Sequence, residues 1–125
     1  MISGNFEVRE QVGPKGYFGR VALQAEPEAP ESGYEIAFDE QHAQRWQTGA
    51  RFGIEYVLEH IPKKKLFPNG IRILVSCIDG HEVDTTNSII AYVAANALME
   101  ALQDRVSLNK RPVLKTSEGL VEFPK

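Results

Sequence analysis

Residues 4–27, GNFEVREQVGPKGYFGRVALQAEP, decide the fold of this chain. In residues 5–11 apolar and polar side chains alternate, as a strand that is buried on one face requires. A second strand-like run, rich in apolar side chains, covers residues 18–24. Because a short connection rich in glycine and proline joins the two runs, the stretch predicts a β-hairpin with a longer loop.

Further strands and helices follow the hairpin. Apolar residues recur at helical spacing in two later segments. Asp84, Thr85 or Thr86 can cap the second helix at its N-terminus. Gly49 and Gly53 each cost the first helix roughly 1 kcal/mol against Ala, so we expect a close packing partner beside them. The later strands are predicted at residues 34–38, 71–78, 113–115 and 120–123, and the helices at residues 45–60 and 86–104.

This order of elements predicts an α+β fold with a mixed sheet. Each helix has a single apolar stripe, so we expect both helices on one face of one sheet. A chain of 125 residues has the usual size of one compact domain, and we expect residues 1–125 to form a single domain.

Composition limits which cellular compartment and which kinds of partner we expect. The lone Cys77 cannot form an intrachain disulfide and fits a reducing compartment. The N-terminus lacks the apolar run of a secretory signal, and no stretch approaches the roughly 18 apolar residues of a membrane span. We therefore expect a cytoplasmic protein that has no membrane contact. The net charge of −3 requires any nucleic-acid contact to use a local patch.

Three short motifs carry a resemblance to a known family. Residues 15–21, KGYFGRV, are similar to R-G-Q-Y-G-H-V in domain IV of elongation factor G. Residues 80–86, GHEVDTT, are similar to that domain's Y-H-D-V-D-S-S, and residues 111–114, RPVL, to its K-P-V-L. The motifs occur in the family's order and span nearly the whole chain. The chain therefore resembles a free-standing, divergent domain IV without the GTPase.

The resemblance implies both a fold and a function. The fold is that of the second domain of ribosomal protein S five, which contains a left-handed βαβ crossover, an exception to the usual right-handed rule. The hairpin loop and the loop at residues 80–86 are expected to meet at one tip that contacts the ribosome or tRNA, with no GTPase activity and no nucleotide. The implied RNA-contacting tip comprises Lys15, Gly16, Tyr17, Phe18, Gly19, Arg20 and His81.

Each of these side chains also has a structural interpretation. Lys15 and Arg20 can neutralise phosphates, and Tyr17 can stack on an unpaired base; equally, they can belong to a solvated turn. Phe18 begins a strand, which favours a place in the core. His81 is either a tip residue, as the resemblance implies, or an exposed loop histidine.

A second basic segment follows the first helix. Lys63, Lys64 and Lys65 could contact RNA backbone, although a three-lysine run more often ends a helix, where it complements the negative end of the dipole. Cys77 is expected on the apolar face of its strand, as a small buried side chain.

Nothing in the sequence predicts catalysis. A phosphate-cradling G-x-x-x-x-G-K-[ST] motif does not occur, and the histidines lack ligand spacing, so we expect no enzyme activity, no cofactor and no metal. An alternative stays open, namely a repurposed protein-interaction module of the same fold that makes no RNA contact. The net acidity and the acidic side chains within residues 26–31 favour this alternative.

Overall fold

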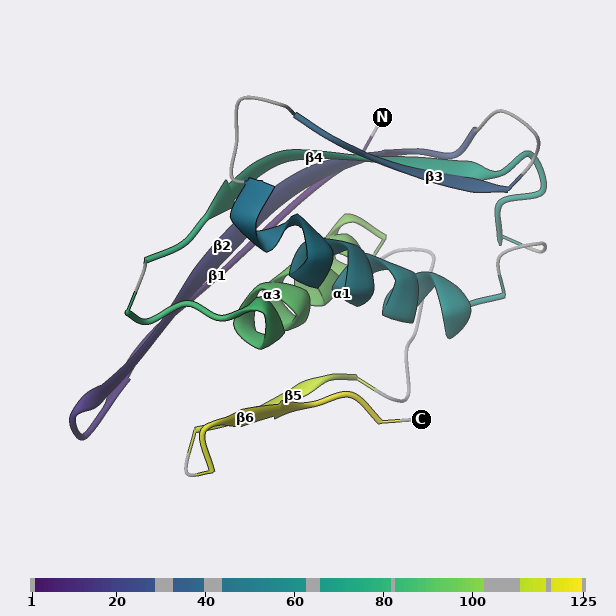
Figure 1. Ribbon diagram of the computed structural model, residues 1–125. Helices are drawn as coiled ribbons and strands as arrows, with labels where there is room; N and C mark the ends of the chain where they lie inside the picture. Colours follow the sequence, from purple (N-terminus) through teal and green to yellow (C-terminus); the bar gives the residue numbers. More distant parts are fainter. Residues whose placement is uncertain are drawn as a thin grey trace.

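The fold has three layers. The computed structural model describes residues 2–28, 33–39, 44–62, 66–81, 83–102, 111–116 and 118–124. Figure 1 shows a twisted sheet, helices α1 and α3 on one of its faces, and a small hairpin on the far side of the helices. The elements are β1 (Ile2–Val12), β2 (Lys15–Glu26), β3 (Tyr34–Phe38), the 3₁₀ turn η2 (Gln44–Trp46), α1 (Gln47–Glu59), β4 (Ile71–Asp79), α3 (Asn87–Ala101), β5 (Val113–Lys115) and β6 (Leu120–Glu122).

The main sheet is mixed, as the sequence predicted. Its order is β1-β2-β4-β3, with β3 parallel to β4 and the other pairs antiparallel. This sheet, with both helices on one face, confirms the α+β fold class. Because α1 lies between the two parallel strands in the chain, a βαβ crossover is present. Its left-handed sense stays a prediction.

The β1–β2 hairpin is longer and tighter than expected. Its ladder runs from the pair Ile2 and Ala25 to the pair Val12 and Lys15, so the connection has only two residues. The first of them, Gly13, has φ +59°, a left-handed conformation that glycine adopts without steric cost. The predicted longer loop is therefore wrong, because its residues continue the two strands.

The helices pack closely at the glycines of α1. A Cβ atom added to Gly53 would lie 2.0 Å from the carbonyl oxygen of Ala91 in α3. This contact confirms the expected packing partner. Of the three candidate caps, Thr86 occupies the N-cap of α3, and its hydroxyl accepts a hydrogen bond from the backbone N–H of Ile89 at 3.2 Å.

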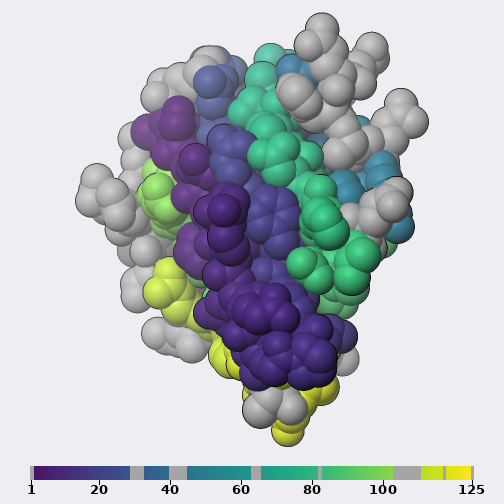
Figure 2. Space-filling view, turned by 90° about the vertical axis from the view of Figure 1, so that its left-hand side faces the viewer, coloured from purple at the N-terminus to yellow at the C-terminus, as the bar shows by residue number. Residues whose placement is uncertain are grey.

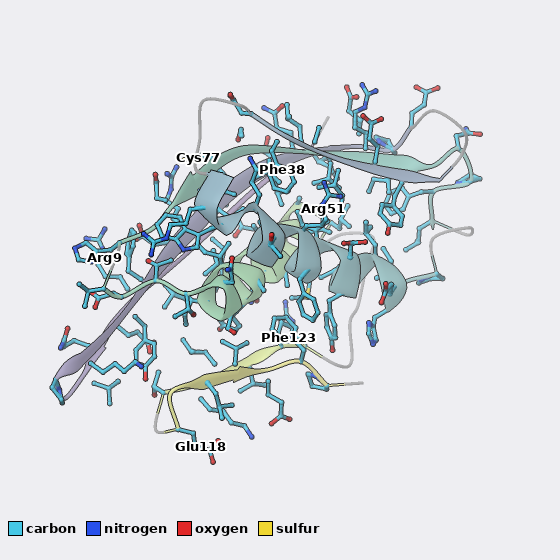
Figure 3. The ribbon with its side chains drawn as sticks, viewed as in Figure 1. Arg9, Phe38, Arg51, Cys77, Glu118 and Phe123 are labelled. Carbon is cyan, nitrogen blue, oxygen red and sulfur yellow. The ribbon has the colours of Figure 1, made fainter. Side chains whose placement is uncertain are left out.

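The last two strands correct the expectation of a single sheet. β5 and β6 pair only with each other and lie against the helices. With three residues each, they stand at the short end of the usual strand length and add no strand to the main sheet. Instead, the Phe123 ring packs at 5.0 Å from the ring of Phe52 and 5.2 Å from that of Tyr56, and Figure 3 shows Phe123 between this hairpin and α1.

A β-bulge in β4 corrects the placement of Cys77. Ala22 pairs with Cys77 and Leu23 pairs with Val75, so Ser76 is an extra residue in the ladder. The extra residue reverses the alternation, and Ile78 enters the core while Cys77 lies on the outer face. The thiol is half-buried beside Arg20, and burial, followed by the charge of Asp79, raises its pKa.

Candidate functional site

The hairpin places a cation over an aromatic ring on the outer face of the sheet. Arg9 pairs with Phe18 in the ladder, and the guanidinium carbon of Arg9 lies 5.4 Å from the centroid of the Phe18 ring. Arg9 is highly exposed and Phe18 is half-buried. Figure 2 shows β1, β2 and β4 side by side, with the hairpin end of β1 and β2 nearest the viewer.

The connection between β4 and α3 is tied to the same hairpin by a buried hydroxyl. Thr85 is only 6% exposed, and its Oγ1 donates a hydrogen bond to the carbonyl of Phe18 at 2.7 Å. The same oxygen accepts from the backbone N–H of His81 at 2.6 Å. The N–H of Phe18 in turn donates to the carbonyl of Asp84 at 3.0 Å. The two segments singled out by the resemblance therefore meet at one end of the sheet.

His81 presents its ring to solvent from this connection. The side chain is exposed, and its Nδ1 accepts a hydrogen bond from the backbone N–H of Val83 at 3.3 Å. When Nδ1 of a neutral imidazole accepts a hydrogen bond, the proton is on Nε2. Nε2 can then donate a hydrogen bond to a ligand. Gly80, just before His81, lies against the Trp46 ring, where a Cβ atom would come within 2.5 Å.

A groove of about 480 Å³ runs between the two segments. Its charge is mixed, because Arg9 contributes a cation while Glu10 and Asp84 contribute carboxylates. The groove offers a guanidinium, an imidazole and an aromatic ring within one hollow. Its walls are Arg9, Glu10, Gln11, Tyr17, Phe18, Gly80, His81 and Asp84.

The structure exchanges the expected places of the two aromatic residues. Tyr17, expected as a candidate for base stacking, is 4% exposed, and its hydroxyl donates to the carbonyl of Thr116 at 3.1 Å. Phe18, expected in the core, lies on the outer face under Arg9. The cause is the alternation of β2, in which Tyr17 shares the inward face of Val21 and Leu23, so Phe18 faces outward.

The tip glycines are structural. Gly16 is buried, and a Cβ atom there would lie 2.8 Å from the Asp84 carboxylate; Gly19 is buried against Ile89 and Ile90 of α3. Their absent side chains allow the hairpin to approach the start of α3. They therefore position the site without presenting an atom at its surface.

The basic residues of the tip do not gather in one place. Lys15 is exposed but lines a separate hollow of about 260 Å³ toward β6. Arg20 lies on the outer face, where its bond to Asp79 raises its pKa and neutralises its charge locally. Lys63, Lys64 and Lys65 lie outside the described residues.

Sequence analysis missed several residues that line or support the site, among them Arg9, Glu10, Gln11 and Thr85. In the sequence, Arg9 is one of the polar positions of the strand predicted at residues 5–11, and Thr85 is one of three cap candidates. A two-residue turn at Gly13 and Pro14 would have placed Arg9 opposite Phe18, so the signal for Arg9 was present in the sequence. Burial of Thr85 has no such local signal.

Two features are absent from the described part of the chain. No three side chains among its histidines, cysteines and carboxylates are grouped to hold a metal ion. None of its helices is both long and apolar enough to cross a membrane.

Comparison with known proteins shows the fold alone. No protein-family model and no curated protein matches the chain. The crystal structure of ttk003000868 from Thermus thermophilus is similar, with a TM-score of 0.65 and 24% identity over 82% of this chain. The chain spans 16% of the length of that Thermus protein. The likeness covers most of this chain and supports the α+β fold.

Proposed function

We propose that the chain is a divergent relative of domain IV of elongation factor G that contacts ribosomal RNA or tRNA through the groove. The observation that carries the proposal is the junction made by Thr85, which joins the two motif-bearing segments beside Phe18 and His81. The protein acts by occupancy, with no GTPase activity or nucleotide of its own. Its partner is the ribosome or a tRNA bound there, in the cytoplasm.

The groove supplies the contacts that structured RNA uses. The guanidinium of Arg9 can pair with a phosphate, and Nε2 of His81 can donate to a phosphate or a base edge. The partly exposed ring of Phe18 can stack on an unpaired base, a contact worth about 1–3 kcal/mol. The Arg9 guanidinium lies over this ring, so a base that stacks there displaces Arg9, which can then pair with the adjacent phosphate.

Ribosome co-sedimentation at low and moderate salt tests the proposal. We expect Arg9→Ala to weaken binding and to reduce the slope of log affinity against log salt by about 1, as the loss of one phosphate contact requires. Arg51→Ala is a matched control, because Arg51 is also exposed and also lies 5.4 Å from a phenylalanine ring, that of Phe38. Figure 3 shows Arg51 on α1, away from the groove.

Two outcomes contradict the proposal. One is that the chain is absent from ribosomal fractions at low salt, where phosphate contacts are strongest. The other is that Arg9→Ala and Arg51→Ala bind ribosomes equally well. Recovery of a protein partner that resists nuclease treatment, without ribosomes, would instead support the protein-interaction alternative.

A further inference from the structure

Strand β1 presents a long edge with which no second described strand is paired. It is the outer strand of the main sheet, and no other strand among the described residues pairs with its outer side. Its 11 residues pair with β2 without a bulge and include no proline. Outer strands are usually short, bulged or interrupted by proline, because their unpaired backbone groups can bind another strand. β1 has none of these three features, and the charged side chains of Glu7, Arg9 and Glu10 are what restricts its pairing.

Symmetry restricts how a second copy could pair with this edge. Two copies that extend one sheet across a two-fold axis keep their outer faces on the same side. Since side chains alternate, each outer-face residue must then lie opposite another outer-face residue. In the antiparallel register, one residue of β1 must therefore lie opposite the same residue of the second copy. The charges of β1 decide which residue this is.

The side chains of β1 favour one centre. A register centred on Glu7 or on Arg9 places that residue opposite its own copy, and like charges directly opposite are destabilising. A register centred on Val8 places Glu7 opposite Arg9 twice, and it also places Asn5 opposite Gln11. We infer that the chain forms a homodimer in which two β1 strands pair antiparallel about Val8.

The two charged side chains are exposed, although Arg9 also lies over the Phe18 ring within its own chain. In one chain Glu7 and Arg9 lie 3.5 Å apart, with side chains 42% and 75% exposed. An ion pair this exposed is weak, so exchanging it for two pairs across the dimer costs little. The pairing would also bring Asn5 of the second copy beside Gln11, which lines the groove. This inference does not depend on RNA binding.

Charge reversal tests the dimer directly. Sedimentation equilibrium should give the mass of two chains for the native protein. Glu7→Lys places lysine opposite arginine, and Arg9→Glu places glutamate opposite glutamate. Each variant alone should show a dissociation constant raised at least about tenfold. An equimolar mixture should recover the dimer, because both cross-strand contacts then join opposite charges.

A control and a third variant keep the test decisive. Glu118→Lys changes the net charge as Glu7→Lys does, at the β5–β6 turn, and should leave the dimer unchanged. The double exchange Glu7→Arg with Arg9→Glu should dimerise like the native protein. A native protein that stays monomeric, or single variants that dimerise alone and do not respond to mixing, overturns the inference.

Discussion

At the scale of single residues, Thr85 joins both segments of the site through one hydroxyl. That hydroxyl donates to one segment and accepts from the other, so both hydrogen-bonding directions are used at a buried position. Its backbone N–H also donates to the carbonyl of His81 at 2.9 Å. The geometry of the groove therefore depends on this side chain, although it does not line the groove.

Replacing Thr85 by valine tests that dependence. Valine has nearly the same shape, but the carbonyl of Phe18 and the N–H of His81 lose their partner. We expect the free energy of unfolding, measured in urea, to fall by about 1–3 kcal/mol. Thr48→Val, at an exposed position of α1, is the control and should change stability by less than about 0.5 kcal/mol. Equal stabilities of the two variants would contradict the role given to Thr85.

At the scale of secondary structure, sequence patterns predicted the elements well and their registers less well. Alternation located the strands, and helical periodicity located α1 and α3 within a few residues. A shift of one residue reverses which side chains face the core, and the alternation of β2 extends as far as Tyr17, which turns Tyr17 inward and Phe18 outward. The bulge at Ser76 likewise moved Cys77 from the expected inner face to the outer face. The residues around Ser76 include no glycine or other signal that predicts a bulge.

The candidate site was predicted in part for the same reason. Motif resemblance predicted that the His81 connection and the hairpin lie together, and the hydrogen bonds of Thr85 confirm their proximity. Lys15 lines a different hollow from His81, and Arg20 shares the outer face of Phe18 but is paired with Asp79. That information lies in tertiary pairing, which no local pattern encodes.

Close helix packing reverses the effect on stability that replacing glycine by alanine usually has. In an exposed helix, replacing glycine by alanine stabilises by about 1 kcal/mol. At Gly53 the added methyl group meets the Ala91 carbonyl, and the helices must separate. We expect Gly53→Ala to lower the thermal midpoint, with a net loss of about 1–2 kcal/mol. Gly33→Ala, where nothing lies within 4 Å of the added atom, should have little effect. A rise in the midpoint for Gly53→Ala would refute this account.

At the scale of the whole molecule, two tyrosine hydroxyls join the β5–β6 layer to the rest of the described chain. The Tyr17 hydroxyl donates to the Thr116 carbonyl, and the Tyr56 hydroxyl donates to the carbonyl of Pro124. Burial raises the pKa of Tyr56. The stability from this protonated hydroxyl is therefore complete below the ordinary tyrosine pKa of about 10 and is lost as pH rises through the higher folded value.

Removing both hydroxyls should release this layer before the others. For the double variant Tyr17→Phe with Tyr56→Phe, we expect faster hydrogen exchange at β5 and β6 and unchanged exchange in β2 and β4. Exchange measured by mass spectrometry on peptides resolves the two regions. A uniform increase across all peptides would mean that the layers unfold together.

The strand order also has a consequence during synthesis on the ribosome. β2 is central in the sheet, but its second neighbour, β4, is translated only after α1. At about 5–20 residues per second, roughly 3–10 s pass between completion of β2 and completion of β4. Throughout that interval one side of a long apolar strand has no partner. Nascent chains crowded on one messenger would therefore be most prone to mispair during this delay.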